Sequence, residues 1–341
     1  MPSQDYKFKR FWYPTSVNLK YACGGYLCNP EEKWGHIYNP DLVAFDGISE
    51  KPCLVLLGEA GMGKTTAAEQ AYSQISQKLS GSEDVCLWFK LINYDSDKDL
   101  CDAIFRNETF QAWCRGKHKL YLFLDSLDEG LLSIKKLVII LKREIEKLPC
   151  DRLYFRITCR TADWKDGLEK KLKEKWGEAN VGVYQLAPLL RENVIEEANK
   201  RGINSDNFLQ EVFSKNAIPL ATKPITLKFL LGIYQNGRFP SSQKDLYEEG
   251  CLQMCEEVNP DRRDSDNIGS LCAKKRLIIA SRIAALLLFS DKSDKSAKSA
   301  IWINPEYGDM PQTDIAIRDV CLGRENIDQQ EFFFDENCIK K

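Results

Sequence analysis

Short apolar runs alternate with amphipathic stretches through the middle of the chain. Segments that are apolar at nearly every position and end at glycine or polar residues are typical of strands buried on both faces. Cys53–Leu57 is such a run, and four further strands are predicted at Val85–Leu91, Leu120–Leu124, Arg152–Thr158 and Val181–Leu186. Between them, apolar residues recur at helical spacing, as do Ala67, Ala71 and Ile75. This alternation predicts an α/β fold with a doubly wound, parallel five-stranded sheet.

The pattern becomes wholly helical after Pro188. Helices are expected at 191–200, 207–215, 225–234 and 244–257, and a longer one is expected around residues 277–287. The polar stretches 259–267 and 290–300 are expected to be loops, and a strand is expected at 331–334. Because the chain stops directly after that strand, we expect it to be truncated within a domain.

These patterns divide the chain into four regions. Residues 1–50 are rich in aromatic residues, glycine and proline and are expected to form an irregular arm. Residues 51–190 form the predicted α/β domain, residues 191–236 an all-α helical domain, and residues 237–341 a further helical region.

Composition and charge argue against a membrane partner and do not indicate a nucleic-acid partner. The 341 residues carry a formal net charge of −2, so no overall field favours nucleic acid or anionic lipid. The longest apolar stretch, Ile278–Phe289, contains Arg282 and is too short to span a bilayer. The basic N-terminus lacks the apolar core of a signal peptide, so a cytoplasmic location is expected.

Cysteine usage is consistent with that location. The 13 cysteines are scattered along the chain and are expected to be reduced and mostly buried. Neither Cys23 with Cys28 nor Cys251 with Cys255 has C-x-x-C spacing, and the sequence contains only two histidines. A structural metal is therefore not predicted.

A phosphate-binding loop follows the first predicted strand. Residues 58–65 match G-x-x-x-x-G-K-[ST] at every fixed position, and Thr66 follows; the loop consists of Gly58, Glu59, Ala60, Gly61, Met62, Gly63, Lys64 and Thr65. Chance gives this match in roughly 1 of 100 chains of this length, and a buried strand before the loop and an amphipathic helix after it reduce that chance further. Such loops cradle phosphates with backbone N–H groups. We expect Lys64 to bridge the β- and γ-phosphates of ATP and the Thr65 hydroxyl to bind Mg²⁺.

Carboxylates cap the third predicted strand. Asp125 lies where an Mg²⁺-site carboxylate belongs, and Asp128 or Glu129 could polarise an attacking water. The spacing does not decide which of the two is the base. The structural alternative is an acidic cap on the following helix.

Arg160 ends the fourth predicted strand. A cation at that position could contact the γ-phosphate and sense its presence. An ordinary solvated arginine is the alternative.

Taken together, these segments resemble a known family. GEAGMGKTT, LFLDSLDE, ITCRT and KPITLKFLL are similar to the NACHT clade of STAND signalling ATPases, most closely bacterial NACHT-like proteins of conflict and antiphage systems. The resemblance spans about residues 51–235. Ser126 departs from it, because glycine is commoner at that position. The resemblance implies that Arg160 reads the γ-phosphate and that Pro224 contacts the base or its surroundings, with Pro219 as a second candidate. A proline that simply begins a helix remains the alternative.

The resemblance also implies a wider architecture and function. A winged-helix domain would follow the helical domain, so residues 237–341 would cover its beginning. A sensor for an unknown trigger would lie in a missing C-terminal region. Mg-ATP binding and slow hydrolysis would then control conformation and self-association, in a setting such as antiviral defence. Two other functions stay open: an AAA-type ATPase that remodels DNA or protein, and a P-loop small-molecule kinase. The choice between adenine and guanine also stays open.

Overall fold

The computed structural model describes residues 8–234, 237–255, 272–289, 301–302 and 315–316. The loops expected at 259–267 and 290–300 and the strand expected at 331–334 lie outside the described residues. The chain divides into two compact units, Met1–Phe239 and Pro240–Lys341, which are described separately. The expected nucleotide-binding and helical domains both lie in the first unit.

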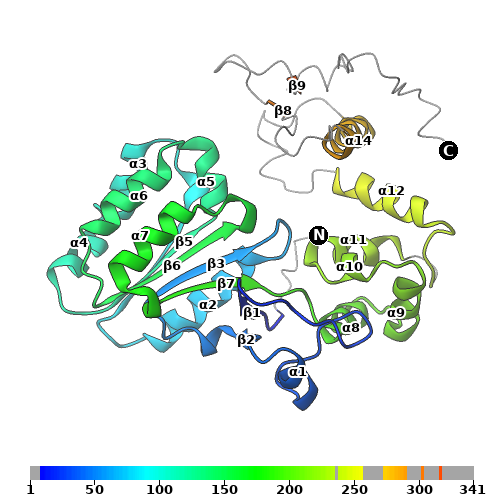
Figure 1. Ribbon diagram of the computed structural model, residues 1–341, viewed down its shortest axis with the longest axis horizontal. Helices are drawn as coiled ribbons and strands as arrows, with labels where there is room; N and C mark the ends of the chain where they lie inside the picture. Colours follow the sequence, from blue (N-terminus) through cyan, green and yellow to red (C-terminus); the bar gives the residue numbers. More distant parts are fainter. Residues whose placement is uncertain (1–7, 235–236, 256–271, 290–300, 303–314, 317–341) are drawn as a thin grey trace. The chain divides into compact units, whose positions relative to one another are not determined.

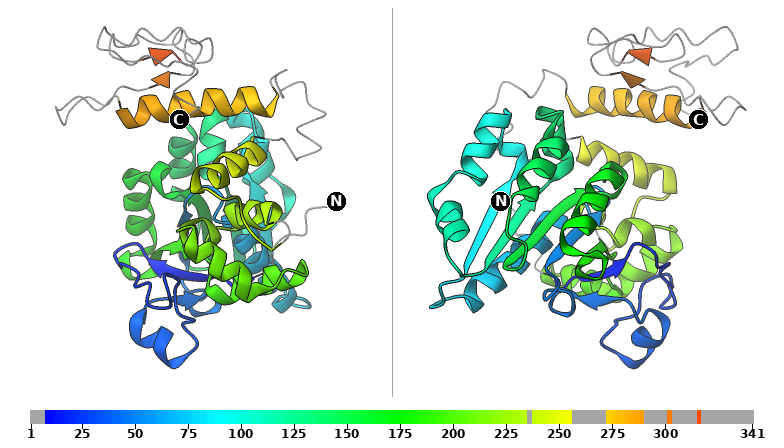
Figure 2. Two further views of the ribbon diagram at one scale, coloured as in Figure 1. Left: turned by 90° about the vertical axis from the view of Figure 1, so that its right-hand side faces the viewer. Right: turned by 60° about the vertical axis from the view of Figure 1, so that its left-hand side comes forward.

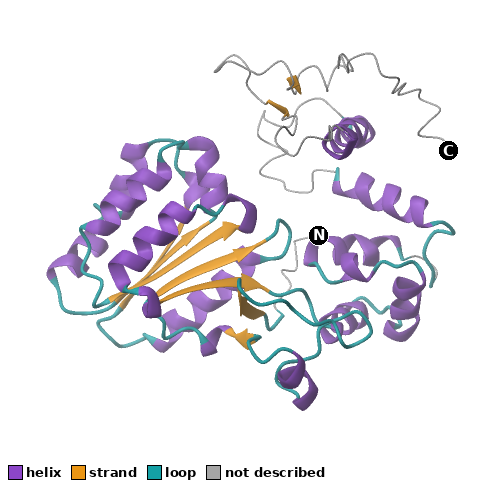
Figure 3. Ribbon diagram, viewed as in Figure 1, coloured by secondary structure: helices purple, strands orange, loops and turns teal. Residues whose placement is uncertain are grey.

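A mixed seven-stranded sheet forms the centre of the first unit, with helices around it (Figures 1 and 3). The strands lie in the order β2-β1-β7-β3-β6-β5-β4. Their bounds are β1 (Phe11–Pro14), β2 (Val43–Ala44), β3 (Cys53–Gly58), β4 (Val85–Lys90), β5 (Leu120–Asp125), β6 (Leu153–Arg160) and β7 (Val181–Leu186). The five predicted strands are all present and mutually parallel, which confirms the predicted fold class.

The N-terminal region adds two strands that the sequence pattern did not predict. β1 runs antiparallel to both β7 and β2, with Trp12 opposite Leu186 and Phe11 opposite Ala44. Figure 2 shows this segment, in dark blue, against the rest of the unit. Part of residues 1–50 is therefore ordered sheet and not an irregular arm. β1 has only four residues and ends at Pro14, so it is too short to show an alternating pattern.

Helices cover both faces of the parallel strands. They are α2 (Lys64–Lys78), α3 (Asp97–Ile104), α4 (Glu108–Arg115), α5 (Leu127–Ser133), α6 (Leu137–Glu146) and α7 (Asp166–Trp176), and α1 (Lys33–Tyr38) lies in the N-terminal region. Single turns of 3₁₀ helix occur at Phe45–Gly47, Leu91–Asn93, Thr161–Asp163 and Glu178–Asn180. α2 packs on one face, and α3 to α7 contribute to the core on the other.

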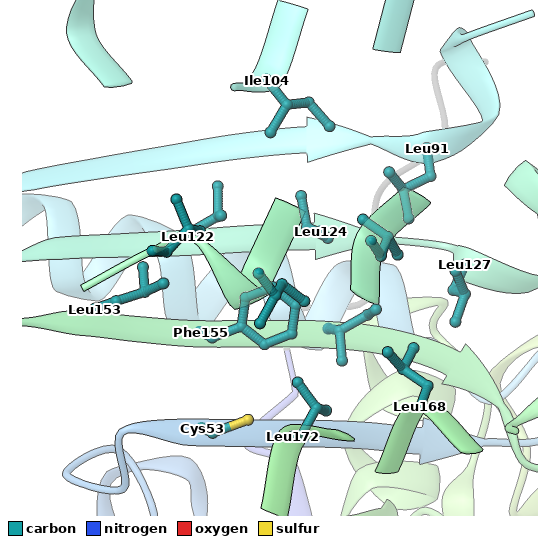
Figure 4. Packing of buried hydrophobic residues seen from close by; sticks show 14 of the residues in the cluster. Cys53, Leu91, Ile104, Leu122, Leu124, Leu127, Leu153, Phe155, Leu168 and Leu172 are labelled. Atoms are coloured by element: carbon teal, nitrogen blue, oxygen red, sulfur yellow. The ribbon is translucent and has the colours of Figure 1, made fainter. Parts of the chain in front are cut away.

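Alternation along β3 shows how the two faces are built. Cys53, Val55 and Leu57 belong to the core under α3 to α7, whereas Leu54 and Leu56 belong to the core under α2. Figure 4 shows the first of these cores, where side chains from α7 lie over β3 and β6. β3 is therefore buried on both faces and fixed firmly, which positions the loop that follows it.

A helical segment completes the first unit, as predicted. It contains α8 (Arg191–Lys200), α9 (Ser205–Ser214), α10 (Ile218–Ala221) and α11 (Pro224–Ile233). The short helix α10 was not predicted, because four residues cannot show helical periodicity. Pro224 is the first residue of α11, where its missing N–H costs nothing. The rings of Phe208, Tyr234 and Phe239 pack together and tie the end of the segment to α9.

The second unit contains α12 (Gln243–Met254), α14 (Ala273–Phe289) and the strands β8 (Ile301–Trp302) and β9 (Ile315–Ala316). β8 and β9 pair in parallel. Arg276 donates a hydrogen bond to the carbonyl of Cys255 at 3.1 Å, which connects α14 to the end of α12. Among the described residues, no helix has the length and apolarity needed to cross a membrane.

One pair of cysteines differs from the expectation of reduced thiols. Cys23 and Cys28 form a disulfide across a tight turn. Gly24 and Gly25 in this turn adopt positive φ angles of 63° and 87°, which brings the two cysteine Cα atoms within 5.3 Å. This proximity cannot be read from the spacing of the cysteines alone. The other described cysteines are free thiols.

Candidate nucleotide-binding site

The loop 58–65 joins the carboxyl end of β3 to the first turn of α2. Gly61 and Gly63 have φ angles of 74° and 83°, a left-handed conformation that favours glycine. Gly63 caps α2, which begins at Lys64. The positive end of the helix dipole is therefore directed at the loop, as an anion site requires.

The Lys64 side chain folds back onto the start of the loop. Its ammonium Nζ donates hydrogen bonds to the carbonyl oxygens of Gly58 at 2.8 Å and Glu59 at 3.0 Å. Burial lowers the pKa of Lys64, while the carboxylate of Asp128 acts in the opposite direction. A partly desolvated cation held by neutral carbonyls is well suited to bind an anion.

Asp125 connects three elements at the carboxyl edge of the sheet. Its carboxylate is buried, with 1% of the residue exposed. One oxygen, Oδ2, accepts hydrogen bonds from the hydroxyls of Thr65 at 3.1 Å and Ser126 at 3.0 Å. The other, Oδ1, accepts from the hydroxyl of Thr158 at 2.6 Å. The expected partners Thr65 and Asp125 are thus in direct contact although 60 residues separate them.

The sheet order explains why Thr158 takes part. β6 lies between β3 and β5, so a side chain near the end of β6 stands between the loop and Asp125. The Thr158 hydroxyl also accepts a hydrogen bond from the backbone N–H of Ser126 at 2.7 Å. Thr158 therefore fixes both the carboxylate and the turn that follows it.

Asp128 and Arg160 form an ion pair. The guanidinium Nε of Arg160 lies 2.8 Å from Asp128 Oδ2, and the backbone N–H of Arg160 donates to Asp128 Oδ1 at 3.0 Å. Both carboxylate oxygens are thereby engaged. Asp128 is buried, whereas 46% of the Arg160 side chain is exposed. The structure thus brings together a residue from the turn after the third predicted strand and a residue from the end of the fourth.

Glu129 lies in the same first turn of α5 but has a different environment. Its residue is half-buried, and its carboxylate makes no hydrogen bond or ion pair with the residues that the structure describes. Because Ser126 caps α5, Asp128 and Glu129 also occupy the positions of an acidic helix cap. The geometry is thus compatible both with an acidic cap on α5 and with a catalytic role for these carboxylates.

The loop, the strand before it and the helix after it have the arrangement of a P-loop NTPase. No protein-family model matches the chain, and no curated protein matches it in sequence. Among solved structures, the ORC2 protein of Aeropyrum pernix in ADPNP–ADP complexes is 14% identical, covering 76% of this chain and 80% of that chain with a TM-score of 0.38. The ORC1 protein of the same organism in complex with DNA is 14% identical, covering 72% and 68% with a TM-score of 0.41. Cdc6p of Pyrobaculum aerophilum is 13% identical, covering 77% and 76% with a TM-score of 0.39.

The helical segment touches the back of the loop. The backbone N–H of Ile225 donates to the carbonyl of Gly61 at 3.4 Å, and a Cβ at Gly61 would lie only 2.3 Å from the Ile225 side chain. Lys223, the cap of α11, forms an ion pair with Glu59. Pro224 Cγ is 3.6 Å from the point where a Cβ at Gly63 would lie. α11 is therefore in direct contact with the phosphate-binding loop.

A pocket of about 380 Å³ opens beside the loop. Its volume falls within the range of small-molecule sites, about 300–1,000 Å³. It is lined by two tyrosines, by apolar residues and by a few polar groups: Tyr13, Tyr21, Gly25, Glu59, Met62, Gln185, Leu186, Pro188, Ile218, Pro219, Thr222 and Lys223. Pro219 thus lines the pocket, whereas the family resemblance favoured Pro224.

Sequence reasoning missed some groups of this site. Thr158 carries a weak signal, since it is a hydroxyl residue inside a mostly apolar strand, two positions before Arg160. Tyr13 and Tyr21 belong to the aromatic-rich region 1–50, where nothing in the sequence distinguishes them from the other aromatic residues. The Glu59–Lys223 pair joins residues 164 positions apart and has no sequence signal.

Proposed function

We propose that this protein binds Mg-ATP at loop 58–65 and hydrolyses it slowly, as a switch of the STAND/NACHT type. The observation that carries the proposal is the contact between Thr65 and Asp125 beside Lys64. A hydroxyl, a buried carboxylate and a partly desolvated ammonium thereby lie around one phosphate-binding loop. These are the parts that P-loop ATPases need for phosphate and Mg²⁺.

The residues present suit Mg²⁺. Mg²⁺ prefers hard oxygen ligands and is usually held by one or two carboxylates or hydroxyls, by waters and by the substrate phosphates. Thr65 and Asp125 supply such oxygens, and no cation pairs with Asp125 among the described residues. Within the same residues, no group of three or more His, Cys, Asp or Glu side chains that could hold a metal ion occurs. Waters and the substrate phosphates would supply the remaining oxygens. The ion would neutralise charge on the β- and γ-phosphates.

Glu129 is the better candidate for the general base. Both oxygens of Asp128 are engaged by Arg160, whereas the Glu129 carboxylate is available to accept a proton from water. Asp128 instead holds Arg160 at the end of β6. This end lies next to the loop, because Arg160 is opposite Gly58 in the pairing of β3 with β6. From this position Arg160 is suited to sense the γ-phosphate.

The pocket beside the loop is suited to a nucleoside. It is continuous with the loop through Glu59 and Met62, so a base placed there leaves its phosphates at Lys64. Tyr13, Tyr21 and Pro219 offer flat and apolar surfaces of the kind that pack against a base. We assign the base contact to Pro219, and Pro224 supports the loop.

The contacts between the loop and α11 couple nucleotide binding to the placement of α11. Binding of phosphates to the loop alters the surroundings of Glu59 and Gly61, and both residues touch α11. A ligand that prefers one placement of α11 shifts the population toward it. Self-association in response to a trigger would follow from such a shift.

A turnover measurement with a sizing measurement tests this function. The rate of ATP hydrolysis and the oligomeric state by chromatography are compared for the wild type, Lys64→Ala and Glu129→Gln. We expect slow hydrolysis by the wild type, no nucleotide binding by Lys64→Ala, and binding without hydrolysis by Glu129→Gln. Fast, untriggered turnover contradicts the switch and favours an AAA-type motor. Transfer of phosphate to a small acceptor supports a kinase instead.

A further inference from the structure

Arg10 lies outside the loop but binds its backbone. It precedes β1, and its side chain is partly buried. The guanidinium Nη1 donates to the carbonyl of Met62 at 2.7 Å, and Nη2 donates to the carbonyl of Ala187 at 2.7 Å. The planar guanidinium group of Arg10 therefore bridges two chain segments that are more than 120 residues apart in sequence.

The contact with Met62 has a consequence for the next peptide group. In a trans peptide the C=O of one residue and the N–H of the next point in opposite directions. Because Arg10 holds the Met62 carbonyl, the N–H of Gly63 points away from Arg10. Nη1 also lies 3.1 Å from the point where a Cβ at Gly63 would stand. Arg10 therefore supports the loop from behind at the residue that caps α2.

The contact with Ala187 links the loop to the connection between β7 and the helical segment. Ala187 follows β7, and its backbone N–H donates to the carbonyl of Phe11 at 2.9 Å. Two residues later, Leu189 donates to the carbonyl of Thr222 at 2.7 Å, just before α11. The guanidinium thus sits where the N-terminal segment, the loop and the connection to the helices meet.

Among the residues that the structure describes, no carboxylate forms an ion pair with Arg10, and burial lowers the pKa of Arg10 to about 10. A partly desolvated cation whose described partners are carbonyl dipoles is costly. An anion bound on the other side of the loop would offset that cost, because Coulomb attraction is strong where water is excluded.

We propose that Arg10 is a positioning residue that couples phosphate binding at loop 58–65 to the docking of the N-terminal segment and of the connection at Ala187. This inference rests on the proposed function, since it concerns the same nucleotide site. By linkage, phosphate binding stabilises the docked segment, and the docked segment strengthens phosphate binding by the same factor.

The test compares the wild type with Arg10→Met, which keeps the length but removes charge and donors, and Arg10→Lys, which keeps the charge but not the fork. Two quantities are measured on the full chain: the Kd for Mg-ATP and the amide hydrogen exchange of residues 8–14 and 187–189 with and without Mg-ATP. Loss of hydrogen bonds from a charged group typically weakens binding by about tenfold or more. We expect that loss for Arg10→Met and an intermediate loss for Arg10→Lys.

The exchange data separate coupling from plain structural support. Mg-ATP should slow exchange in both segments of the wild type, and this effect should vanish in Arg10→Met. If Arg10→Met binds with wild-type affinity, or if Mg-ATP still protects both segments in it, the coupling is refuted while the proposed function stands. Should Arg10→Met fail to fold, Arg10→Lys with wild-type affinity and protection refutes it equally. Absence of Mg-ATP binding by the wild type refutes the proposed function itself.

Discussion

Asp125 accepts hydrogen bonds from hydroxyls on α2, on β6 and on the turn after β5. Asp125 and Thr65 were both predicted from the sequence, because strand ends and phosphate loops have recognisable patterns. The role of Thr158 was not, because it depends on β6 lying between β3 and β5. Strand order is a property of tertiary packing that periodicity along the chain does not encode.

Thr158→Val keeps the shape of the side chain and removes its hydroxyl. Asp125 then loses its shortest hydrogen bond, and the Ser126 N–H loses its acceptor in a buried site. We expect the free energy of unfolding to fall by about 1–3 kcal/mol, the cost of unsatisfied buried groups. Urea denaturation measures it. Thr158→Ser, which retains the hydroxyl, is the control and should lose less; equal losses for both variants would argue against the network.

Lys64→Met should stabilise the nucleotide-free protein at neutral pH. Burial lowers the pKa of Lys64 in the folded state, so the folded protein disfavours its charged form relative to the unfolded chain. The unfolded state therefore binds more protons between the lowered pKa and about 10.4, the ordinary value, and the stability of the wild type rises with pH across that window. The variant lacks this dependence.

Melting temperatures of the wild type and Lys64→Met between pH 7 and pH 10.5 measure the effect. The advantage of the variant should be largest at pH 7 and should shrink as pH rises through the lowered pKa. A gap that stays constant or widens with pH would show that the loop does not destabilise the charged ammonium.

Among the elements, long periodic segments were predicted well and short ones were not. The five core strands and the helices α8, α9 and α11 follow from their apolar patterns. β1 and α10 have only four residues each, and their structure comes from contacts with distant segments. The Cys23–Cys28 disulfide was likewise not predicted, because it depends on two glycines in left-handed conformation.

Charge reversal at Lys223 tests the contact between the loop and α11. Both partners of the Glu59–Lys223 pair are partly exposed, and such pairs are worth about 0.2–1 kcal/mol. Lys223→Glu should therefore speed the dissociation of ADP by at most about fivefold, measured by stopped-flow fluorescence. Adding Glu59→Lys should restore the wild-type rate, and 1 M salt should shrink the effect.

Lys228→Glu makes the same charge change on α11. Lys228 is exposed and has no ion pair among the described residues, so it is the matched control. If it speeds dissociation as much as Lys223→Glu does, the effect is one of net charge and not of the pair.

At the scale of the whole molecule, the cores that support the site lie in the first unit. The clusters on both faces of the sheet, and the aromatic group of Phe208, Tyr234 and Phe239, all belong to Met1–Phe239. Most of the region expected to begin a winged-helix domain lies outside the described residues, so that expectation stays a prediction.

A chain that ends at Phe239 should therefore fold alone and keep its nucleotide site. A compact unit with its own core is expected to unfold in one cooperative transition. Calorimetry should show that single transition, and the Kd for Mg-ATP should stay within about threefold of the full chain, since no residue of the site is removed. Aggregation of the shortened chain would show that the first unit does not fold alone, and binding weaker by tenfold would show that the second unit contributes to the site.

The most direct test of the central claim is calorimetric titration of the full chain with ATP in the presence of Mg²⁺, compared with Lys64→Ala and with Lys228→Glu as a remote control. We predict one nucleotide per chain for the wild type and for Lys228→Glu, and no measurable binding for Lys64→Ala. Unchanged binding by Lys64→Ala, or no binding by the wild type, would contradict the assignment of loop 58–65 as a nucleotide site.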